Sequence, residues 1–303
     1  MLRAILLRHC LIQVMLRSSL MLPAQKNDSI PFQLTEYNNL SVRAILNKTD
    51  TVNLMFHTAA NAVTLTEESV KWLKSIRFTE STDSIKSWGS QSNSSGLSPG
   101  NFLEIGGLSW NKVPIWENLN SGQFTDGKFG IDLFKGRVIA IDFDKLLINV
   151  SDSLPYNIDQ YQQVKLANED DELFIEADCK TRDSVFKNRF LIHSGYSGAI
   201  LFDDEFAKNS KLDERLELTG EKKLTDSYGN VLITKQAVLP ALNIRGLELT
   251  DVPAGFFKGA IGRQQMSIIG GDILKRFNIV IDATRTYIYF QPNKLSGTAY
   301  LKL

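Results

Sequence analysis

Cysteine and histidine are scarce in this 303-residue sequence. The two cysteines are Cys10 and Cys179, and the three histidines are His9, His57 and His193. If an N-terminal leader is removed, Cys179 stands alone, which excludes an intramolecular disulfide and a cysteine metal site. We therefore interpret Cys179 as a buried structural thiol.

A surplus of one charge sign and a long apolar run are also missing. Lys and Arg together number 34, as do Asp and Glu, so no basic surplus indicates nucleic-acid binding. No uninterrupted run of about 18 apolar residues occurs, which argues against a transmembrane helix. A dinucleotide glycine fingerprint, a phosphate loop and an HExxH motif are absent as well. We accordingly expect no nucleic-acid partner, no membrane span and no cofactor.

The first 25 residues differ in composition from the rest of the chain. MLRAILLRHCLIQVMLRSSLMLPAQ (1–25) is apolar and contains arginine, and the first acidic residue is Asp28. A positive start, an apolar middle and a small residue before Gln25 are typical of a secretory signal that is cleaved after Ala24. An Arg-rich presequence or a misassigned start codon would look similar. We expect export to the periplasm or the extracellular space.

Four sequence blocks occur twice and in the same order. LMFHTAANAVTLTEE (54–68) aligns without gaps with FLIHSGYSGAILFDD (190–204), which pairs His57 with His193. The later blocks KSWGS, LEIGGLSWNKVP and GIDLFKGRVIAID match DSYGN, LNIRGLELTDVP and GGDILKRFNIVID. The spacing between partners stays close to constant along the chain. This order and spacing indicate a duplication into two tandem domains.

The repeat divides the body of the chain into two units. We expect an N-terminal lobe over 30–150, a polar connector over 151–165 and a C-terminal lobe over 166–303. Most apolar runs are short, rich in Val, Ile, Phe and Tyr, and bounded by Gly, Asn and Asp, as is typical of strands. TEESVKWLKSI (66–76) is the strongest helix candidate, and DSYGN (226–230) predicts a hairpin tip. The predicted fold is mainly β, with two similar lobes.

The order of elements in each unit resembles a known family. An apolar strand leads to a histidine, a hydroxyl residue and a small residue; a hairpin with an aromatic-Gly tip follows, and an apolar-Gly block enters a short helix. This order resembles the aspartic peptidase superfamily, in a bilobal pepsin-like arrangement of retropepsin-like lobes, over about residues 30–295. The resemblance implies two β-barrel-like lobes whose interlobe cleft binds an extended peptide or protein segment through its backbone. We expect the protein to be a monomer.

The resemblance also implies which residues form the site. In the family each lobe contributes Asp-Thr/Ser-Gly, and the two aspartates share a proton and activate water. His57 and His193 stand at these dyad positions. Thr58 and Ser194 match the hydroxyl position, and Gly195 matches the glycine.

Three further positions bear on the resemblance. Ala59 departs from the family pattern, because it stands where the glycine is expected. Trp88 and Tyr228 stand at the flap tips, where they would close over a bound peptide. We expect these two aromatic side chains either to contact a ligand or to pack against the other lobe.

The loss of both carboxylates excludes standard aspartic catalysis. Two adjacent imidazoles lower each other's proton affinity, so one or both are neutral near pH 7. The histidines then either pack in the cleft, hydrogen-bond a peptide or water, act as acid and base, or bind a divalent metal ion. For a metal the sequence names no third ligand, whereas catalytic zinc needs about three. The leading hypothesis is a peptide-binding homologue without catalysis. The alternative is a hydrolase that uses His57 and His193.

Several other motifs receive a structural interpretation. GYSGA resembles a nucleophile elbow, but no histidine follows Ser197 as that fold requires. Asp142 and Asp282 end matched strands, where aspartate commonly bonds the local backbone. Asp132 and Asp272 stand at predicted helix starts, where we expect them to cap exposed N–H groups.

Overall fold

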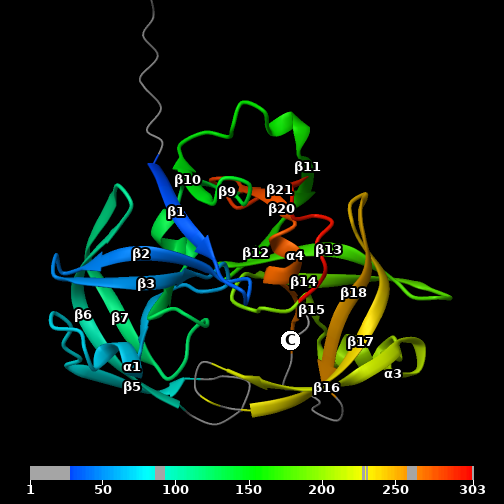
Figure 1. The fold of residues 1–303 in the computed structure, drawn as a ribbon, viewed down its shortest axis with the longest axis horizontal. Helices are drawn as coiled ribbons and strands as arrows, with labels where there is room; N and C mark the ends of the chain where they lie inside the picture. The colour runs from blue at the N-terminus through cyan, green and yellow to red at the C-terminus, as the bar shows by residue number, and fades with distance from the viewer. Residues whose placement is uncertain (1–27, 86–92, 227–228, 230, 258–264, 302–303) are drawn as a thin grey trace, which may run out of the picture.

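The computed structural model describes residues 28–85, 93–226, 229, 231–257 and 265–301, and the predicted leader over 1–25 lies outside them. In Figure 1 one group of strands lies on the left, a second lies on the right, and a third lies above and between them. The described part of the chain contains no helix that is long and apolar enough to cross a membrane.

The upper sheet joins the two halves of the chain. Its strands follow the order β11-β21-β20-β9-β10-β1, and every neighbouring pair is antiparallel. The central pairing places Val280 of β20 opposite Ala140 of β9, so strands from distant parts of the sequence meet here. The bounds are β1 (Asp28–Leu34), β9 (Val138–Asp142), β10 (Leu147–Ser151), β11 (Gln162–Lys165), β20 (Phe277–Ile281) and β21 (Tyr287–Pro292).

The N-terminal lobe continues this sheet through β2, β3, β8, β4, β7, β6 and β5. The bounds are β2 (Leu40–Leu46), β3 (Asp50–Phe56), β4 (Val63–Thr66), α1 (Glu67–Val70), β5 (Glu80–Ile85), β6 (Asn93–Ile105), β7 (Leu108–Asn118), β8 (Gly127–Phe129) and the 3₁₀ helix η1 (Ile131–Phe134). A second 3₁₀ helix, η2 (Ile158–Gln160), lies between β10 and β11.

The C-terminal lobe is a separate sheet in the order β12-β13-β14-β19-β15-β18-β17-β16. The bounds are β12 (Ala167–Glu169), β13 (Glu172–Lys180), β14 (Val185–His193), β15 (Ile200–Leu201), α2 (Asp204–Asn209), α3 (Leu212–Arg215), β16 (Glu217–Thr225), β17 (Val231–Ile244), β18 (Leu247–Phe257), β19 (Ser267–Gly270) and α4 (Gly271–Leu274).

Both lobes repeat one pairing pattern. The strand before each histidine pairs in parallel with a short strand, β3 with β8 and β14 with β19. The next strand pairs in parallel with a long hairpin strand, β4 with β7 and β15 with β18. It also runs antiparallel to the short strand in both lobes. The prediction of a mainly β fold with two similar lobes is therefore confirmed.

The predicted helix over 66–76 is wrong in its length. α1 forms a single turn, with the Thr66 side chain accepting a hydrogen bond from the Ser69 N–H. Beyond this turn the backbone N–H groups of Lys74 and Ser75 donate to the carboxylate of Asp50 on β3. Those N–H groups are taken out of the helical ladder by a residue distant in sequence, so the helix ends early.

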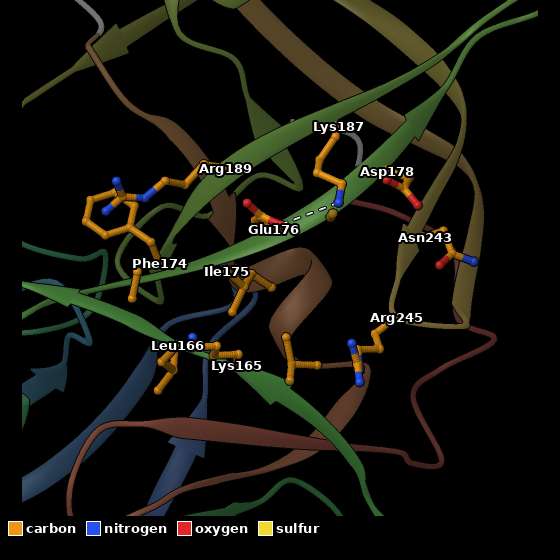
Figure 2. A pocket seen from close by; sticks show the side chains of 13 residues that line it. Lys165, Leu166, Phe174, Ile175, Glu176, Asp178, Lys187, Arg189, Asn243 and Arg245 are labelled. Carbon is orange, nitrogen blue, oxygen red and sulfur yellow. Dashed lines mark ion pairs between the residues drawn. The ribbon is translucent and has the colours of Figure 1, made fainter.

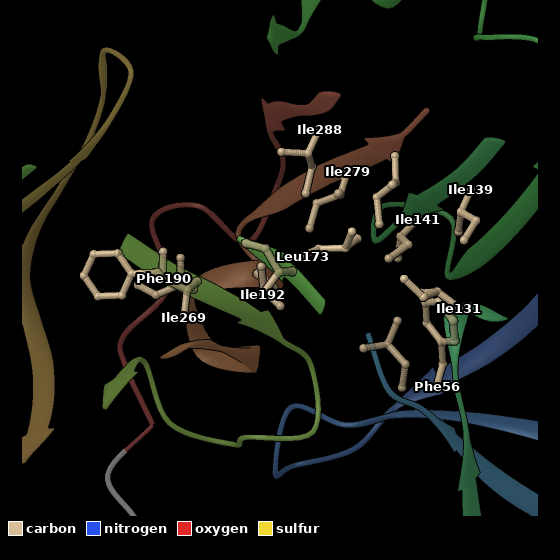
Figure 3. Close-up of a cluster of buried hydrophobic side chains, with 14 of the residues drawn as sticks. Phe56, Ile131, Ile139, Ile141, Leu173, Phe190, Ile192, Ile269, Ile279 and Ile288 are labelled. Atoms are coloured by element: carbon tan, nitrogen blue, oxygen red, sulfur yellow. The ribbon is translucent and has the colours of Figure 1, made fainter. Parts of the chain in front are cut away.

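One apolar core runs through both lobes beneath the histidine loops. Figure 3 shows aromatic and aliphatic side chains from both halves of the chain in this cluster. Phe56 and Phe190, from the two histidine strands, are both fully buried. Burial of each such side chain contributes roughly 1.5–3 kcal/mol to folding. Cys179 is also fully buried, and burial raises its pKa to about 12, so it is the structural thiol that the sequence predicts.

Candidate active site

The two body histidines face each other between the lobes. His57 directly follows β3, and His193 ends β14. The parallel partner strands align Phe56 with Phe129 in one lobe and His193 with Gly270 in the other. The imidazole ring centroids are 4.5 Å apart, with their planes inclined at 61°. The duplication therefore brings two equivalent side chains into edge contact.

A reciprocal set of hydrogen bonds holds the two loops together. The Thr58 N–H donates to Ser194 Oγ at 3.0 Å, and the Ser194 N–H donates to Thr58 Oγ1 at 3.0 Å. Each hydroxyl in turn donates to a carbonyl of the other lobe: Thr58 to Ile192 at 2.6 Å, and Ser194 to Phe56 at 2.8 Å. Both side chains are buried. This network fixes the distance between the imidazoles.

Two glycines permit the close approach of the loops. A Cβ atom on Gly195 would lie 2.3 Å from His57 Cδ2 and 2.4 Å from His57 Nε2. A Cβ atom on Gly130 would lie 1.8 Å from the carbonyl oxygen of Ala60. Real contacts of this kind do not occur below about 3 Å because the atoms would overlap. A larger residue at Gly195 would force the two histidine loops apart, and one at Gly130 would displace the start of η1 from the His57 loop.

The hydrogen bonds define the protonation of one ring. The Ala59 N–H donates to His57 Nδ1 at 3.1 Å, so a neutral His57 carries its proton on Nε2. His193 Nδ1 is buried and has no hydrogen-bond partner within the described part of the chain. One imidazole is thus oriented by its own loop, and the other retains an unsatisfied nitrogen.

A lysine on the N-terminal lobe acts on both imidazoles. Lys128 lies on β8, opposite Met55 of β3. Burial, the neighbouring His193 and the charge of Lys128 hold the pKa of His57 well below 6.5. Burial and the charge of Lys128 lower the pKa of His193 to about 4. Burial lowers the pKa of Lys128 itself to about 8, against the opposing effect of Asp226. Both rings are therefore neutral near pH 7.

Sequence reasoning missed this lysine, although the repeat contains a signal for it. KFGIDLF (128–134) aligns with IIGGDIL (268–274), so Lys128 matches Ile268. A charged residue in one repeat that aligns with an apolar residue in the other, close to the histidines, is a candidate for function. Composition alone does not distinguish it from the other lysines.

The wall on the C-terminal side is apolar. It is a cluster of buried side chains against which Ala59 and Tyr196 pack. The members of this apolar wall are Phe174, Leu191, Leu201, Leu232, Phe257 and Ile268. A low-dielectric wall strengthens any electrostatic interaction at the imidazoles beside it.

The hairpin β16–β17 of the C-terminal lobe touches the other lobe. Asn120 Nδ2 donates to the Asp226 carbonyl oxygen at 3.4 Å. Gly229 has a positive φ of 83°, as expected of a hairpin tip, and a Cβ atom there would lie 2.7 Å from Leu119 Cδ2. The two lobes are therefore in contact at the tip of this hairpin as well as at the histidine loops.

The two aromatic residues expected at hairpin tips, Trp88 and Tyr228, lie outside the described residues. The structure does contain both hairpins, β5–β6 in one lobe and β16–β17 in the other. The expectation that these side chains contact a ligand or the opposite lobe therefore stays a prediction.

The residues that the structure describes contain no group of three or more His, Cys, Asp or Glu that could hold a metal ion. The charge of Lys128 also disfavours a second cation beside the imidazoles.

The sequence argues against a serine hydrolase as well. Ser197 lies in the loop between β14 and β15, whereas a nucleophile elbow stands between a strand and a helix.

The matched strand-end aspartates bond their own turns, as predicted. Asp142 Oδ1 accepts a hydrogen bond from the Lys145 N–H at 2.9 Å. Asp282 Oδ1 accepts one from the Thr286 N–H at 2.8 Å. Neither carboxylate belongs to the histidine site.

Asp132 and Asp272 lie in the first turns of their helices, as predicted. Burial raises the pKa of Asp132, and backbone N–H groups at the start of η1 act to lower it against this larger effect. The N-cap residues of η1 and α4 are Gly130 and Gly270, and Asp132 and Asp272 are the second residues of these helices. Asp272 forms an ion pair with Lys275 at 2.8 Å. The helix starts are close packed, so glycine takes the cap position and the Asp272 carboxylate finds other partners.

A separate pocket of about 580 Å³ opens on the C-terminal lobe. Figure 2 shows that β13 and β14 line it with charged side chains, including Lys187 and Glu176, which form an ion pair at 3.6 Å. Arg189 lies over the Phe174 ring at 3.8 Å. Neither histidine lines this pocket, whose lining carries charges of both signs.

Comparison with known proteins finds similarity at the level of structure. No protein-family model matches the chain, and no curated protein matches its sequence. Among solved structures, the aspartic proteinase from Irpex lacteus superposes with a TM-score of 0.60 at 14% identity, covering 90% of this chain and 99% of that chain. At this identity the likeness shows the fold, which is the bilobal arrangement of a pepsin-like proteinase.

Proposed function

We propose that this protein binds an extended peptide or protein segment between its lobes, without standard aspartic peptidase catalysis. The observation that carries the proposal is the pair of hydrogen-bonded loops that place one imidazole from each lobe at the centre of the fold. We assign His57 and His193 to the dyad positions of the aspartic peptidase superfamily, on the sequence repeat and on this geometry.

The chemistry of the two rings supports the loss of standard catalysis. The dyad of that family needs one carboxylate to activate water and one acid to protonate the leaving amine. Burial and neighbouring positive charge lower the pKa of both His57 and His193, so neither ring is a proton donor of that kind at neutral pH. Among the described residues, no carboxylate contributes to either shift.

The sheet edges support binding of an extended chain. β5 and β16 are the last strands of their sheets, and each belongs to a hairpin beside the cleft. An extended peptide can add to such an edge through main-chain hydrogen bonds, which bind many sequences with modest selectivity. The leader pattern predicts that the protein meets this ligand after export.

The test is a random library of peptides of about ten residues, assayed for both binding and cleavage with the full chain. We expect the wild-type protein to retain a subset of peptides and to cleave none. His57→Ala and His193→Ala should weaken retention, because both rings line the occupied cleft. Absence of retention by the wild-type protein would contradict the proposal.

A matched variant separates lost chemistry from a lost fold. His57→Asp/His193→Asp restores two carboxylates to the same loops, and thermal unfolding checks that it folds. Acid-dependent cleavage by this variant alone would show that the histidines are the reason for the missing activity.

A hydrolase that uses the histidines is the second candidate. The observations that favour it are the proton on His57 Nε2 and the unsatisfied Nδ1 of His193, because a neutral pair offers one donor and one base. A pKa of about 4 makes His193 a weak base, which ranks this candidate second. Cleavage by the wild-type protein that disappears in both alanine variants would establish it.

A further inference from the structure

The centre of the cleft gathers basic groups from three segments. His57 follows β3, His193 ends β14, and Lys128 lies on β8. Burial lowers the pKa of both imidazoles; the charge of Lys128 lowers both further, and His193 also lowers that of His57. Within the described residues the one carboxylate that acts on Lys128 is Asp226, which follows β16. Three basic groups and one acidic group therefore interact electrostatically here.

An unsatisfied nitrogen points to a missing partner. His193 Nδ1 is buried with no hydrogen-bond partner in the described structure. Nearly all buried polar side-chain atoms in proteins are hydrogen-bonded, and an unsatisfied one costs about 1–3 kcal/mol. The loop hydrogen bonds hold the ring in place, so the ring cannot turn away freely to find a partner.

The surroundings determine which kind of group would fit. The apolar wall of the C-terminal lobe offers no counter-charge, and its low dielectric strengthens ionic hydrogen bonds. A ligand cation would be repelled by Lys128. A ligand anion would be attracted by Lys128 and would favour the protonated form of an imidazole.

We propose that the cleft recognises a carboxylate of its peptide ligand, bound by His57, His193 and Lys128. The carboxylate is either an Asp or Glu side chain or the free C-terminus, because both present the same two oxygens. This inference rests on the proposed function and names the ligand class for the same site.

Carboxylate binding is coupled to proton uptake. A carboxylate beside the rings raises the proton affinity of the imidazoles, against the opposing charge of Lys128 from β8. Asp226 acts on Lys128 and keeps that amine charged. The complex therefore takes up protons as it forms at neutral pH, and acidic peptides bind more tightly as the pH falls toward about 5.5.

The experiment uses one peptide retained from the library, synthesised in four versions. The versions carry an internal Glu or Gln and a free or amidated C-terminus. Isothermal titration calorimetry with the full chain measures each dissociation constant, in two buffers of different ionisation enthalpy. We expect one carboxylate to tighten binding about tenfold, with proton uptake. The Glu/Gln and acid/amide comparisons show which carboxylate is bound.

Variants identify the groups responsible. Lys128→Met should reduce the preference for the acidic version to less than about threefold, whereas Lys128→Arg should keep most of it. Lys135→Met, at an exposed lysine after η1, is the matched control and should leave the preference unchanged. If Lys128→Met does not fold, the affinities of the wild-type protein for the acidic and neutral peptides still show whether a carboxylate is recognised.

Two outcomes would overturn the inference, and they are distinguishable. Equal affinity for the acidic and neutral versions contradicts carboxylate recognition but leaves peptide binding intact. Failure of the library to yield any retained peptide contradicts the proposed function, and the inference with it.

Discussion

The two walls of the cleft carry different side chains on matched strands. In the N-terminal lobe, β8 places Lys128 beside Met55 of β3. In the C-terminal lobe, β19 places Ile268 beside Leu191 of β14. The backbone pairing is the same in both, so the repeat preserves the scaffold while one matched position on the short strand differs in charge. The difference places an amine near two imidazoles, and all three titrations are coupled as a result.

The turns after the two histidines differ as well. Gly195 follows Ser194, and a Cβ atom there would overlap the His57 ring. Ala59 follows Thr58, and its methyl group packs against the apolar wall of the other lobe. The equivalence of the two loops therefore ends at the residue after the hydroxyl residue, Gly195 in one loop and Ala59 in the other.

The largest effect on stability is expected when the residues that distinguish the two turns are exchanged. Gly195→Ala places a methyl group 2.3 Å from His57 Cδ2, and we expect it to destabilise the protein by about 3 kcal/mol. The converse change, Ala59→Gly, should cost only about 1 kcal/mol. Urea unfolding of both variants measures the comparison. Similar costs for the two changes would contradict the asymmetry.

The second prediction concerns pH and the histidine of the C-terminal lobe. The pKa of His193 falls from 6.5 to about 4 on folding, so between these values the unfolded chain binds more protons than the native protein. The contribution of His193 to the free energy of unfolding is therefore fully present above about pH 6.5 and falls as the pH drops toward about 4. The change for this group is roughly 3 kcal/mol. Urea unfolding at several pH values in this range should show that the free energy of unfolding depends less steeply on pH in His193→Asn than in the wild-type protein. An equally steep dependence in the variant would rule the linkage out.

The third prediction tests whether the loop network is symmetric. Thr58→Val removes a buried hydroxyl and leaves the Ser194 N–H and the Ile192 carbonyl without it, which should cost about 2 kcal/mol. Ser194→Ala breaks the reciprocal bonds and should cost a similar amount. Thr284→Val, at an exposed hydroxyl, is the control and should change stability by less than about 0.5 kcal/mol. A cost confined to one lobe would show that the network is not reciprocal.

The smallest effect on stability is expected when Lys128 of β8 is replaced by the apolar residue that matches it in the other lobe. Lys128→Ile copies the matched residue Ile268 and should change stability at pH 7 by no more than about 1 kcal/mol, because the cost of burying the amine and its attraction to Asp226 are removed together. The same change should raise the pKa of both imidazoles, since the opposing positive charge is gone. NMR titration of the two imidazole C–H signals measures this directly. Unchanged titration curves would show that Lys128 does not act on the rings.

Much of the fold could be predicted because its signals are local or repeated. Short Val- and Ile-rich runs between turn residues predict strands, and Asp142 and Asp282 bond their own turns as their positions predict. The helix over 66–76 was overpredicted because Asp50, from another strand, binds the N–H groups that would continue it. A propensity argument does not contain such a contact.

The candidate site was only partly predictable. The repeat paired His57 with His193, and the structure brings the two rings to 4.5 Å. Lys128 was missed because nothing in its immediate sequence distinguishes it, and its importance depends on the strand that carries it. The predicted roles of the histidines in binding a peptide stay predictions, as do those of Trp88 and Tyr228.

From the order of residues alone one obtains the strands, the duplication and the two histidines in equivalent turns, because these follow from local patterns and from matching one half of the chain to the other. The protonation of those histidines follows only from the tertiary structure. Their pKa values depend on how deeply the lobes bury them and on an amine more than sixty residues away from either ring, which β8 brings beside β3. Burial and charge at a site are sums over neighbours in space, and a linear sequence does not specify those neighbours.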